Sequence, residues 1–148
     1  MTAISPAALH LIKHYEGLKL EAYQDSVGVW TIGWGHTKTA KCGMVVTKSQ
    51  AEQLLLDDIA EHARGVAGAL KVKVKQHQFD ALVSFAFNLG VGALKGSTML
   101  KLINDGNESA AANQFDRWVY AGGKKLGGLV KRRTSERILF VTGELELL

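Results

Sequence analysis

Glu16, Asp25 and Thr31 lie within sixteen residues of one another in the first quarter of a 148-residue chain. Two carboxyl groups that face one cleft in different environments are the minimum equipment for acid/base hydrolysis of a glycosidic bond. One donates a proton to the leaving oxygen, and the other activates a water or attacks the anomeric carbon. A threonine hydroxyl can help to hold the water. Such spacing is also common on solvated surfaces, so the placement of these residues on the fold decides what they do.

A short helix is the first element that is predicted to position these groups. Ser at the N-cap and Pro at the first helical position, here Ser5-Pro6, are typical of a helix start. Gly17 is typical of a helix end, which places Glu16 in the last turn. The partial negative charge at a helix C-terminus favours the protonated form of a carboxyl group, and a general acid needs that form.

A β-hairpin is predicted next, from about Ala22 to Gly35, with its turn at Ser26-Val27-Gly28. A turn centred there pairs Asp25 with Thr31 across the strands and puts both side chains on one face. On an exposed hairpin Asp25 stays ionised and shares the positioning of a water with Thr31. The apolar residues of the second strand then point to the opposite face: Trp30, Ile32 and Trp34.

The rest of the chain, from about residue 46, is predicted to be helical. Thr47 and Gln50 form a capping box before an apolar stripe. The segment from Gln76 to Leu89 is apolar nearly all round, so we expect a buried central helix. Shorter helices are expected at 97–105, 107–118 and 129–142. The glycine-rich stretch 121–128 is expected to be a flexible loop at a rim of the cleft.

The composition indicates one globular domain. With 47% hydrophobic residues and a single Pro, the chain can bury a core. Its apolar stretches are far shorter than the ~20 residues that cross a bilayer. The first ten residues lack the basic and apolar regions of a signal peptide. We therefore expect a cytoplasmic protein without stable membrane insertion.

The net charge and the cysteine content limit the classes of binding partner and metal site that the chain could have. The net charge of +4 and the pI near 9.2 favour anionic partners such as a cell-wall polymer. The basic residues are spread out without interleaved aromatic residues, so no nucleic-acid partner is expected. Cys42 is the only cysteine, which excludes an internal disulfide and a paired-cysteine metal site. We expect no cofactor and no metal.

The spacing of the three polar residues resembles the phage-type lysozymes, the endolysin family of the T4 and P22 type. Eight residues separate Glu16 from Asp25 and five separate Asp25 from Thr31, as in the family's catalytic motif. The segments around the motif, 15–17, 22–23 and 31–37, are similar to the family as well. Three further blocks extend the resemblance over nearly the whole chain: 79–90, 96–100 and 128–137.

The resemblance implies an α+β lysozyme fold in a single domain, residues 1–148, with the active-site cleft between two lobes. The β-hairpin lobe is expected at about 15–46, the helical lobe at 1–14 and about 67–148, and the connecting helix at 47–66. The implied reaction is hydrolysis of the β-1,4 bond between N-acetylmuramic acid and N-acetylglucosamine in bacterial peptidoglycan. Glu16 would be the general acid, and Asp25 with Thr31 would hold the attacking water, which gives inversion.

Further residues are candidates for substrate binding. Phe87 and Asn88 are similar to cleft-lining residues on the family's central helix, and the alternative for Phe87 is a place in the core. Ser97 or Thr98 could contact a sugar, but helix N-capping is the favoured interpretation of a hydroxyl there.

Three more residues are placed near the catalytic centre by the resemblance. Arg132 is similar to a family arginine that approaches the catalytic Glu16, and the alternative is a solvated basic helix face. Thr37 stands where the family has a larger apolar cleft residue, so substrate contacts differ in that corner. His36 is expected to be a structural, hydrogen-bonding residue rather than a second base.

The implied partner is peptidoglycan, which a monomer would reach from the host cytoplasm through membrane lesions made by a holin. Two alternatives remain open at this point. A lytic transglycosylase uses one Glu and no second carboxylate. A cationic protein could instead permeabilise membranes through basic amphipathic helices.

Overall fold

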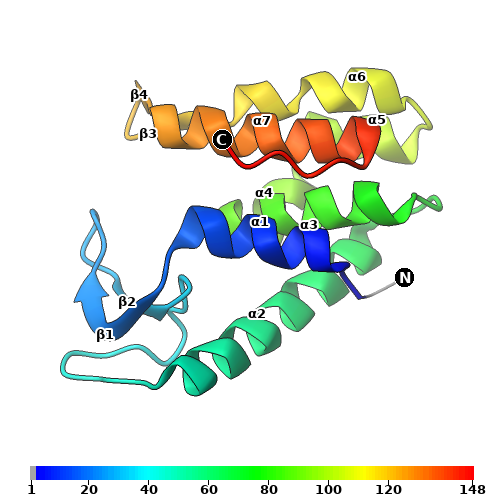
Figure 1. Cartoon of the computed structure of the whole chain (residues 1–148). Coiled ribbons are helices and arrows are strands. Elements are labelled where there is room, and N and C mark those ends of the chain that lie inside the picture. Colours follow the sequence, from blue (N-terminus) through cyan, green and yellow to red (C-terminus); the bar gives the residue numbers. More distant parts are fainter. Residues whose placement is uncertain (1–2) are drawn as a thin grey trace.

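The computed structural model describes residues 3–148. Met1 and Thr2, which belong to the helical lobe expected from the sequence, lie outside the described residues. Figure 1 shows three levels of helices with a β-hairpin beyond the C-terminal end of α1. The elements, in chain order, are α1 (Pro6–Glu16), β1 (Lys19–Gln24), β2 (Trp30–Gly33), α2 (Lys48–Ala69), α3 (Gln76–Leu89), α4 (Val91–Lys95), α5 (Thr98–Asn104), α6 (Glu108–Asn113), the 3-10 helix η1 (Phe115–Arg117), β3 (Tyr120–Ala121), β4 (Lys124–Lys125) and α7 (Gly127–Thr142).

Helix α1 begins and ends where the sequence predicts, but Ser5 does not cap it with its hydroxyl. That hydroxyl donates instead to Oδ2 of Asp80, and the Ser5 amide donates to Oδ1 at 3.0 Å. Asp80 is buried in α3 and needs donors, so it takes the hydroxyl that would otherwise cap the helix. At the other end, Gly17 has φ +69°, a conformation that favours glycine, and Glu16 is the last helical residue.

The β1–β2 hairpin has a register two residues away from the predicted one. Thr31 pairs with Tyr23, not with Asp25. The reason is the Asp25 side chain, whose Oδ1 accepts the backbone N–H groups of Val27 at 3.0 Å and Val29 at 2.8 Å. This closes the turn between Asp25 and Val29. Because the shift is an even number of residues, Asp25 keeps the same face of the hairpin as Thr31.

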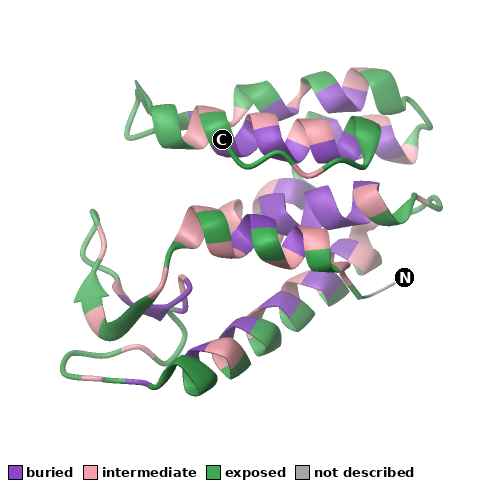
Figure 2. Cartoon of the chain, in the orientation of Figure 1, coloured by how far each residue is buried: buried purple, intermediate pink, exposed green. Residues whose placement is uncertain are grey.

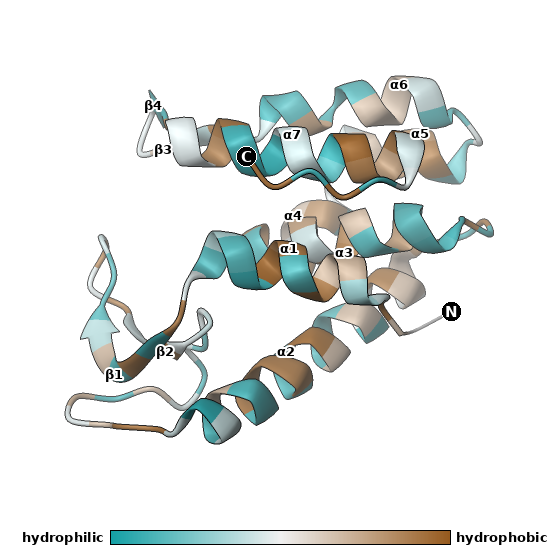
Figure 3. Cartoon of the chain, viewed as in Figure 1, coloured by the Kyte–Doolittle hydropathy of each residue, from teal (hydrophilic) through white to brown (hydrophobic). Residues whose placement is uncertain are grey.

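Helix α2 is the long helix that connects the hairpin to the helical body (Figure 1). Thr47 and Gln50 form the predicted capping box at its start, and the helix continues to Ala69, three residues beyond the predicted connecting helix. Its buried stripe is Ala51, Leu55, Ile59, Ala63 and Val66. Figure 2 shows this stripe on one side of the helix, and Figure 3 shows the matching alternation of apolar and polar residues.

The core lies around α3, which is buried from Gln78 to Ala86 and packs against α1, α2 and α7. Rings of Phe85, Phe115 and Phe140 meet there at centroid distances of 5.6–5.9 Å. Two antiparallel two-stranded sheets accompany the helices, which confirms the α+β class. Within residues 3–148, no helix combines the length and the apolar character that crossing a membrane requires.

Three segments differ from the prediction. The helix expected at 107–118 is α6 followed by the separate turn η1. The stretch 121–128 is not a loop throughout, because it contains part of the β3–β4 hairpin and the first two residues of α7. Helix α4 was not predicted, and it follows α3 directly after Gly90, whose φ of +94° breaks the helical path.

Candidate active site

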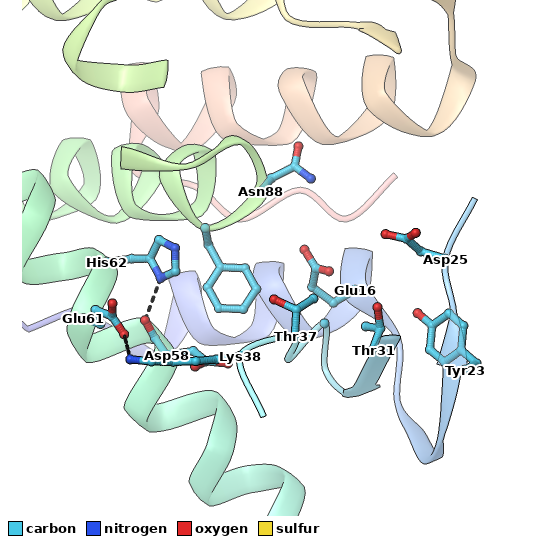
Figure 4. A pocket seen from close by; sticks show the side chains of 12 residues that line it. Glu16, Tyr23, Asp25, Thr31, Thr37, Lys38, Asp58, Glu61, His62 and Asn88 are labelled. Carbon is cyan, nitrogen blue, oxygen red and sulfur yellow. Dashed lines mark hydrogen bonds and ion pairs between the residues drawn. The ribbon is translucent and has the colours of Figure 1, made fainter. Parts of the chain in front are cut away.

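A cleft of about 460 Å³ separates the hairpin from the helices, and it contains all three residues of the Glu-Asp-Thr motif (Figure 4). Glu16 enters it from the end of α1, Asp25 from the turn, and Thr31 from β2. The full lining consists of Glu16, Tyr23, Asp25, Thr31, Gly35, Thr37, Lys38, Asp58, Glu61, His62, Phe87 and Asn88. The structure thus brings two carboxyl groups from different elements to one hollow surface.

The Glu16 carboxylate is held from two sides. Its Oε2 accepts a hydrogen bond of 2.6 Å from Nη1 of Arg132. Its Oε1 faces Gly35, where a Cβ would lie less than 3.0 Å away. The Glu16 side chain is 18% exposed and that of Arg132 is 4% exposed, so the ion pair is largely shielded from solvent.

Arg132 is fixed by more than this ion pair. Its Nε donates to Oε2 of Glu136 at 3.3 Å, and its Nη2 donates to the carbonyl oxygen of Ser84 at 3.2 Å. The guanidinium also lies 5.9 Å from the ring centroid of Tyr15. Arg132 is 3% exposed, so the alternative of a solvated basic face does not apply to it.

Asp25 and Thr31 form the opposite wall. Both backbone hydrogen bonds of the Asp25 side chain go to Oδ1, and no residue in the described range 3–148 donates to Oδ2. The Thr31 hydroxyl donates to the carbonyl oxygen of Val29 at 3.1 Å, which leaves its lone pairs as acceptors. Figure 4 shows the Asp25 and Thr31 side chains on the side of the cleft opposite His62. Together they offer a carboxylate oxygen and a hydroxyl oxygen to a water.

The predicted residues Thr37, Phe87 and Asn88 also line the cleft. The Phe87 ring lies 5.3 Å from the ring of His62, and it is half-buried, so it belongs to the cleft wall rather than to the closed core. Asn88 accepts a hydrogen bond of 2.5 Å at Oδ1 from Nη2 of Arg133. That bond orients the amide and leaves its NH₂ group as the free donor.

His36 is buried beneath the cleft and joins the hairpin lobe to α2. Its Nδ1–H donates to Oδ2 of Asp58 at 2.7 Å, because its Nε2 accepts the backbone N–H of Thr39 at 3.2 Å. Both ring nitrogens are therefore engaged in structural bonds. This arrangement fits the expected structural role.

Ser97 and Thr98 are not brought to the cleft. The Ser97 hydroxyl accepts from the backbone N–H of Leu100 at 3.0 Å and donates to the carbonyl of Leu94 at 2.7 Å, so it caps α5. Ser97 lines a different cavity, and Thr98 is exposed on α5.

Several lining residues were missed from the sequence. Asp58, Glu61 and His62 recur at helical spacing on the polar face of α2, and that periodicity could have placed them together. Lys38 lies 3.3 Å from Glu61 and joins the loop after β2 to the same face.

A second cavity of about 340 Å³ adjoins the cleft at Glu16 and Asn88, and Arg132 lines this second cavity. Leu126 and Gly128 line this second cavity, so the end of the 121–128 stretch lies beside Glu16 without lining the cleft itself. No group of three or more His, Cys, Asp or Glu side chains within the described residues is arranged to hold a metal ion.

The fold and the site define a small α+β protein with acidic residues on both walls of its cleft. The family model "Phage lysozyme" matches residues 13–136. The endolysin of Bacillus phage B103 is 51% identical over 145 residues, which are 95% of this chain and 55% of that protein. The endolysin of Salmonella phage P22 is 38% identical over 147 residues, covering 96% of this chain and all of that protein (100%).

A solved structure agrees with these relatives. The muramidase domain of SpmX from Asticaccaulis excentricus superposes with a TM-score of 0.89 at 40% identity, over 96% of this chain and 99% of that one. The chain belongs to the phage lysozyme family, as the resemblance of its motifs indicated. It spans about half the length of the B103 endolysin.

Proposed function

We propose that this protein is an endolysin that hydrolyses the β-1,4 bond between N-acetylmuramic acid and N-acetylglucosamine in bacterial peptidoglycan. The observation that carries the proposal is the meeting of Glu16, Asp25 and Thr31 in one cleft. The names of the relatives agree with it, since two are endolysins and the structural neighbour is a muramidase domain.

In the proposed reaction, Glu16 protonates the oxygen of the leaving sugar. Its Oε2 is taken by Arg132, so Oε1 is the oxygen that carries the proton. Gly35 supports this assignment, because the absence of a side chain there leaves space beside Oε1. Arg132 keeps the carboxyl group in place and stabilises the charge that develops on Glu16 once the proton has left.

Asp25 and Thr31 act on the opposite face of the sugar. A water donates hydrogen bonds to Oδ2 of Asp25 and to the Thr31 hydroxyl oxygen. This water attacks the anomeric carbon, and one of its protons passes to Asp25. The bond from the anomeric carbon to the leaving oxygen breaks as the new bond to water forms. This single displacement inverts the anomeric configuration, and it requires carboxyl groups roughly 6.5–9.5 Å apart.

Substrate binding is proposed for Thr37, Phe87 and Asn88, which line the cleft, and for Arg132, which lines the adjoining cavity. Phe87 offers an apolar ring face for a sugar, and the free NH₂ group of Asn88 offers a donor for an acetamido carbonyl. Ser97 and Thr98 are left out of this set, because neither lies in the cleft.

Digestion of purified peptidoglycan, followed by analysis of the products, tests the reaction. We expect reducing N-acetylmuramic acid ends whose first-formed anomer is inverted, and we expect the Glu16→Gln variant to release none. Reducing N-acetylglucosamine ends would indicate a glucosaminidase, and anhydro ends would indicate a lytic transglycosylase. Equal clearing of permeabilised Gram-negative cells by Glu16→Gln and the wild type would favour the membrane-permeabilising alternative.

We also propose that the protein acts as a monomer and reaches the wall through a holin lesion. Its net charge of +4 supports retention on an anionic wall polymer. Cells that express the chain alone should lyse only after the membrane is permeabilised. Wall retention should weaken as ionic strength rises, because salt screens exposed charges.

A further inference from the structure

A buried carboxylate outside the cleft, that of Glu136 in α7, is the centre of a charged cluster. Glu136 is 0% exposed. Its Oε2 accepts from the Ser84 hydroxyl at 2.6 Å and from Nε of Arg132 at 3.3 Å. Its Oε1 lies 3.2 Å from Nε of Arg133. One carboxylate thus pairs with two consecutive arginines, which reach it from four and three residues earlier on the helix.

Each arginine extends from Glu136 to a different residue of the cleft. Arg132 donates to Glu16 at 2.6 Å, and Arg133 donates to Asn88 at 2.5 Å. Glu16 and Asn88 both line the cleft, whereas Glu136 does not. Glu136 is therefore connected through one arginine to the proposed acid, Glu16, and through the other to a proposed substrate contact, Asn88.

The cluster is electrically balanced. Glu16 and Glu136 offset the charges of Arg132 and Arg133, and both arginines are buried. Burial lowers the pKa of Arg133, while the charge of Glu136 raises it again. A buried guanidinium without a partner is strongly unfavourable, so Glu136 is what allows two arginines to be charged side by side here.

We propose that Glu136 is a positioning residue that acts through Arg132 on the protonation of Glu16 and through Arg133 on the orientation of Asn88. This inference rests on the proposed role of Glu16 as the general acid. The groups that face the cluster are Arg132 and Arg133 from α7, Ser84 and Asn88 from α3, Glu16 and Tyr15 from α1, and Asp25 across the cleft.

The sign of the effect follows from the charges. Glu136→Gln removes a negative charge, so the arginines favour the ionised form of Glu16 more strongly, and the upper pH limit of activity moves down. Arg133→Gln removes a positive charge, so the limit moves up. We expect each shift to be about one pH unit, because the charges act within a few ångströms in a buried site.

The test is the pH profile of reducing-end release from purified peptidoglycan by the wild type and the two variants. Asp80→Asn is the matched control, since Asp80 is 1% exposed and accepts bonds from Ser5 and Gln76 outside the cleft. It undergoes the same carboxylate-to-amide change at a buried site. Circular dichroism at each pH confirms that the assayed variants are folded.

Opposite shifts in Glu136→Gln and Arg133→Gln, with the Asp80→Asn profile unchanged, would support the proposal. Unchanged limits, or shifts of the same sign, in folded variants would overturn it. If Glu136→Gln does not fold, Arg133→Gln decides, and only an upward shift supports the inference. Absence of product from the wild type would instead refute the proposed function, so the two failures are distinguishable.

Discussion

Gly35 faces the carboxylate of Glu16 so closely that a Cβ on it would overlap Oε1 and touch Cδ at 3.0 Å. Gly35→Ala should therefore displace the proposed acid. Because small misplacements of a catalytic group are costly, we expect reducing-end release to fall by about 100-fold. The variant should also lose about 1–2 kcal/mol of unfolding free energy, since its φ of +73° strains an alanine.

Gly43→Ala is the control for that backbone strain. Gly43 has φ +81°, and no atom lies within 4 Å of the place that an alanine methyl group would take, so it shares the strain without the overlap. Its stability loss should be similar and its activity unchanged. Equal activity in both alanine variants would show that Gly35 does not protect Glu16.

The buried pair of His36 and Asp58 should contribute strongly to stability, because it joins the hairpin lobe to α2 at 2.7 Å with little solvent access. We expect His36→Ala and Asp58→Ala each to lower the unfolding free energy by about 2–3 kcal/mol. The double variant should lose less than the sum, with a coupling of about 1–2 kcal/mol. Urea unfolding measures all four proteins.

A neighbouring pair gives the comparison. Lys38 and Glu61 connect the same two elements at 3.3 Å, but their side chains are 71% and 56% exposed. Their coupling should stay below about 0.5 kcal/mol and decrease with salt. A His36–Asp58 coupling no larger than this would mean that burial adds nothing to the interaction.

Asp25 has two separable tasks in the proposed mechanism, because its Oδ1 closes the turn and the residue also lines the cleft. Asp25→Asn keeps an oxygen acceptor but loses the charge, so activity should fall by about 10²–10⁴ while the turn persists. Asp25→Ala should lose both. Hydrogen exchange of the Val27 and Val29 amides distinguishes them: protection should fall only in Asp25→Ala. Retained activity in Asp25→Asn would contradict its role as the base.

Ser97 should matter for stability alone. Ser97→Ala removes the cap of α5, which should lower the unfolding free energy by about 1 kcal/mol. The KM for soluble peptidoglycan fragments should not change, because the residue lies outside the cleft. Thr98→Ala, at the exposed neighbouring position, is the control and should change neither quantity. A raised KM in Ser97→Ala would instead support the hypothesis that Ser97 contacts a sugar.

Local patterns predicted the elements that depend on nearby residues. The ends of α1, the capping box at Thr47 and the buried helix at Gln76–Leu89 follow from caps, glycines and apolar periodicity. The hairpin register did not, because it depends on which backbone groups the Asp25 side chain accepts. The hydroxyl of Ser5 likewise went to a partner 75 residues away, which no local rule anticipates.

The site shows the same division. The motif spacing identified Glu16, Asp25 and Thr31, and the structure places them together. Glu136 and Arg133 stand in a charged helical segment that looks solvated from the sequence, yet both are 0% exposed. Their burial results from the tertiary packing of α7 against α3, which the local sequence does not show. Their mutual ion pair offsets the free-energy cost of burying the two charges.

Gly17 separates the two halves of the proposed chemistry. Glu16, directly before it, is fastened to the helical body by Arg132, whereas Asp25 and Thr31 follow on the hairpin. Gly17, with φ +69°, is therefore the backbone connection between the helix that carries Glu16 and the hairpin that carries Asp25 and Thr31. A rotation there would change the distance between Glu16 and Asp25 while leaving the hydrogen bonds from Arg132 to Glu16 and from Val27 and Val29 to Asp25 intact. The spacing of the proposed acid and the proposed base thus depends in part on a residue that has no side chain.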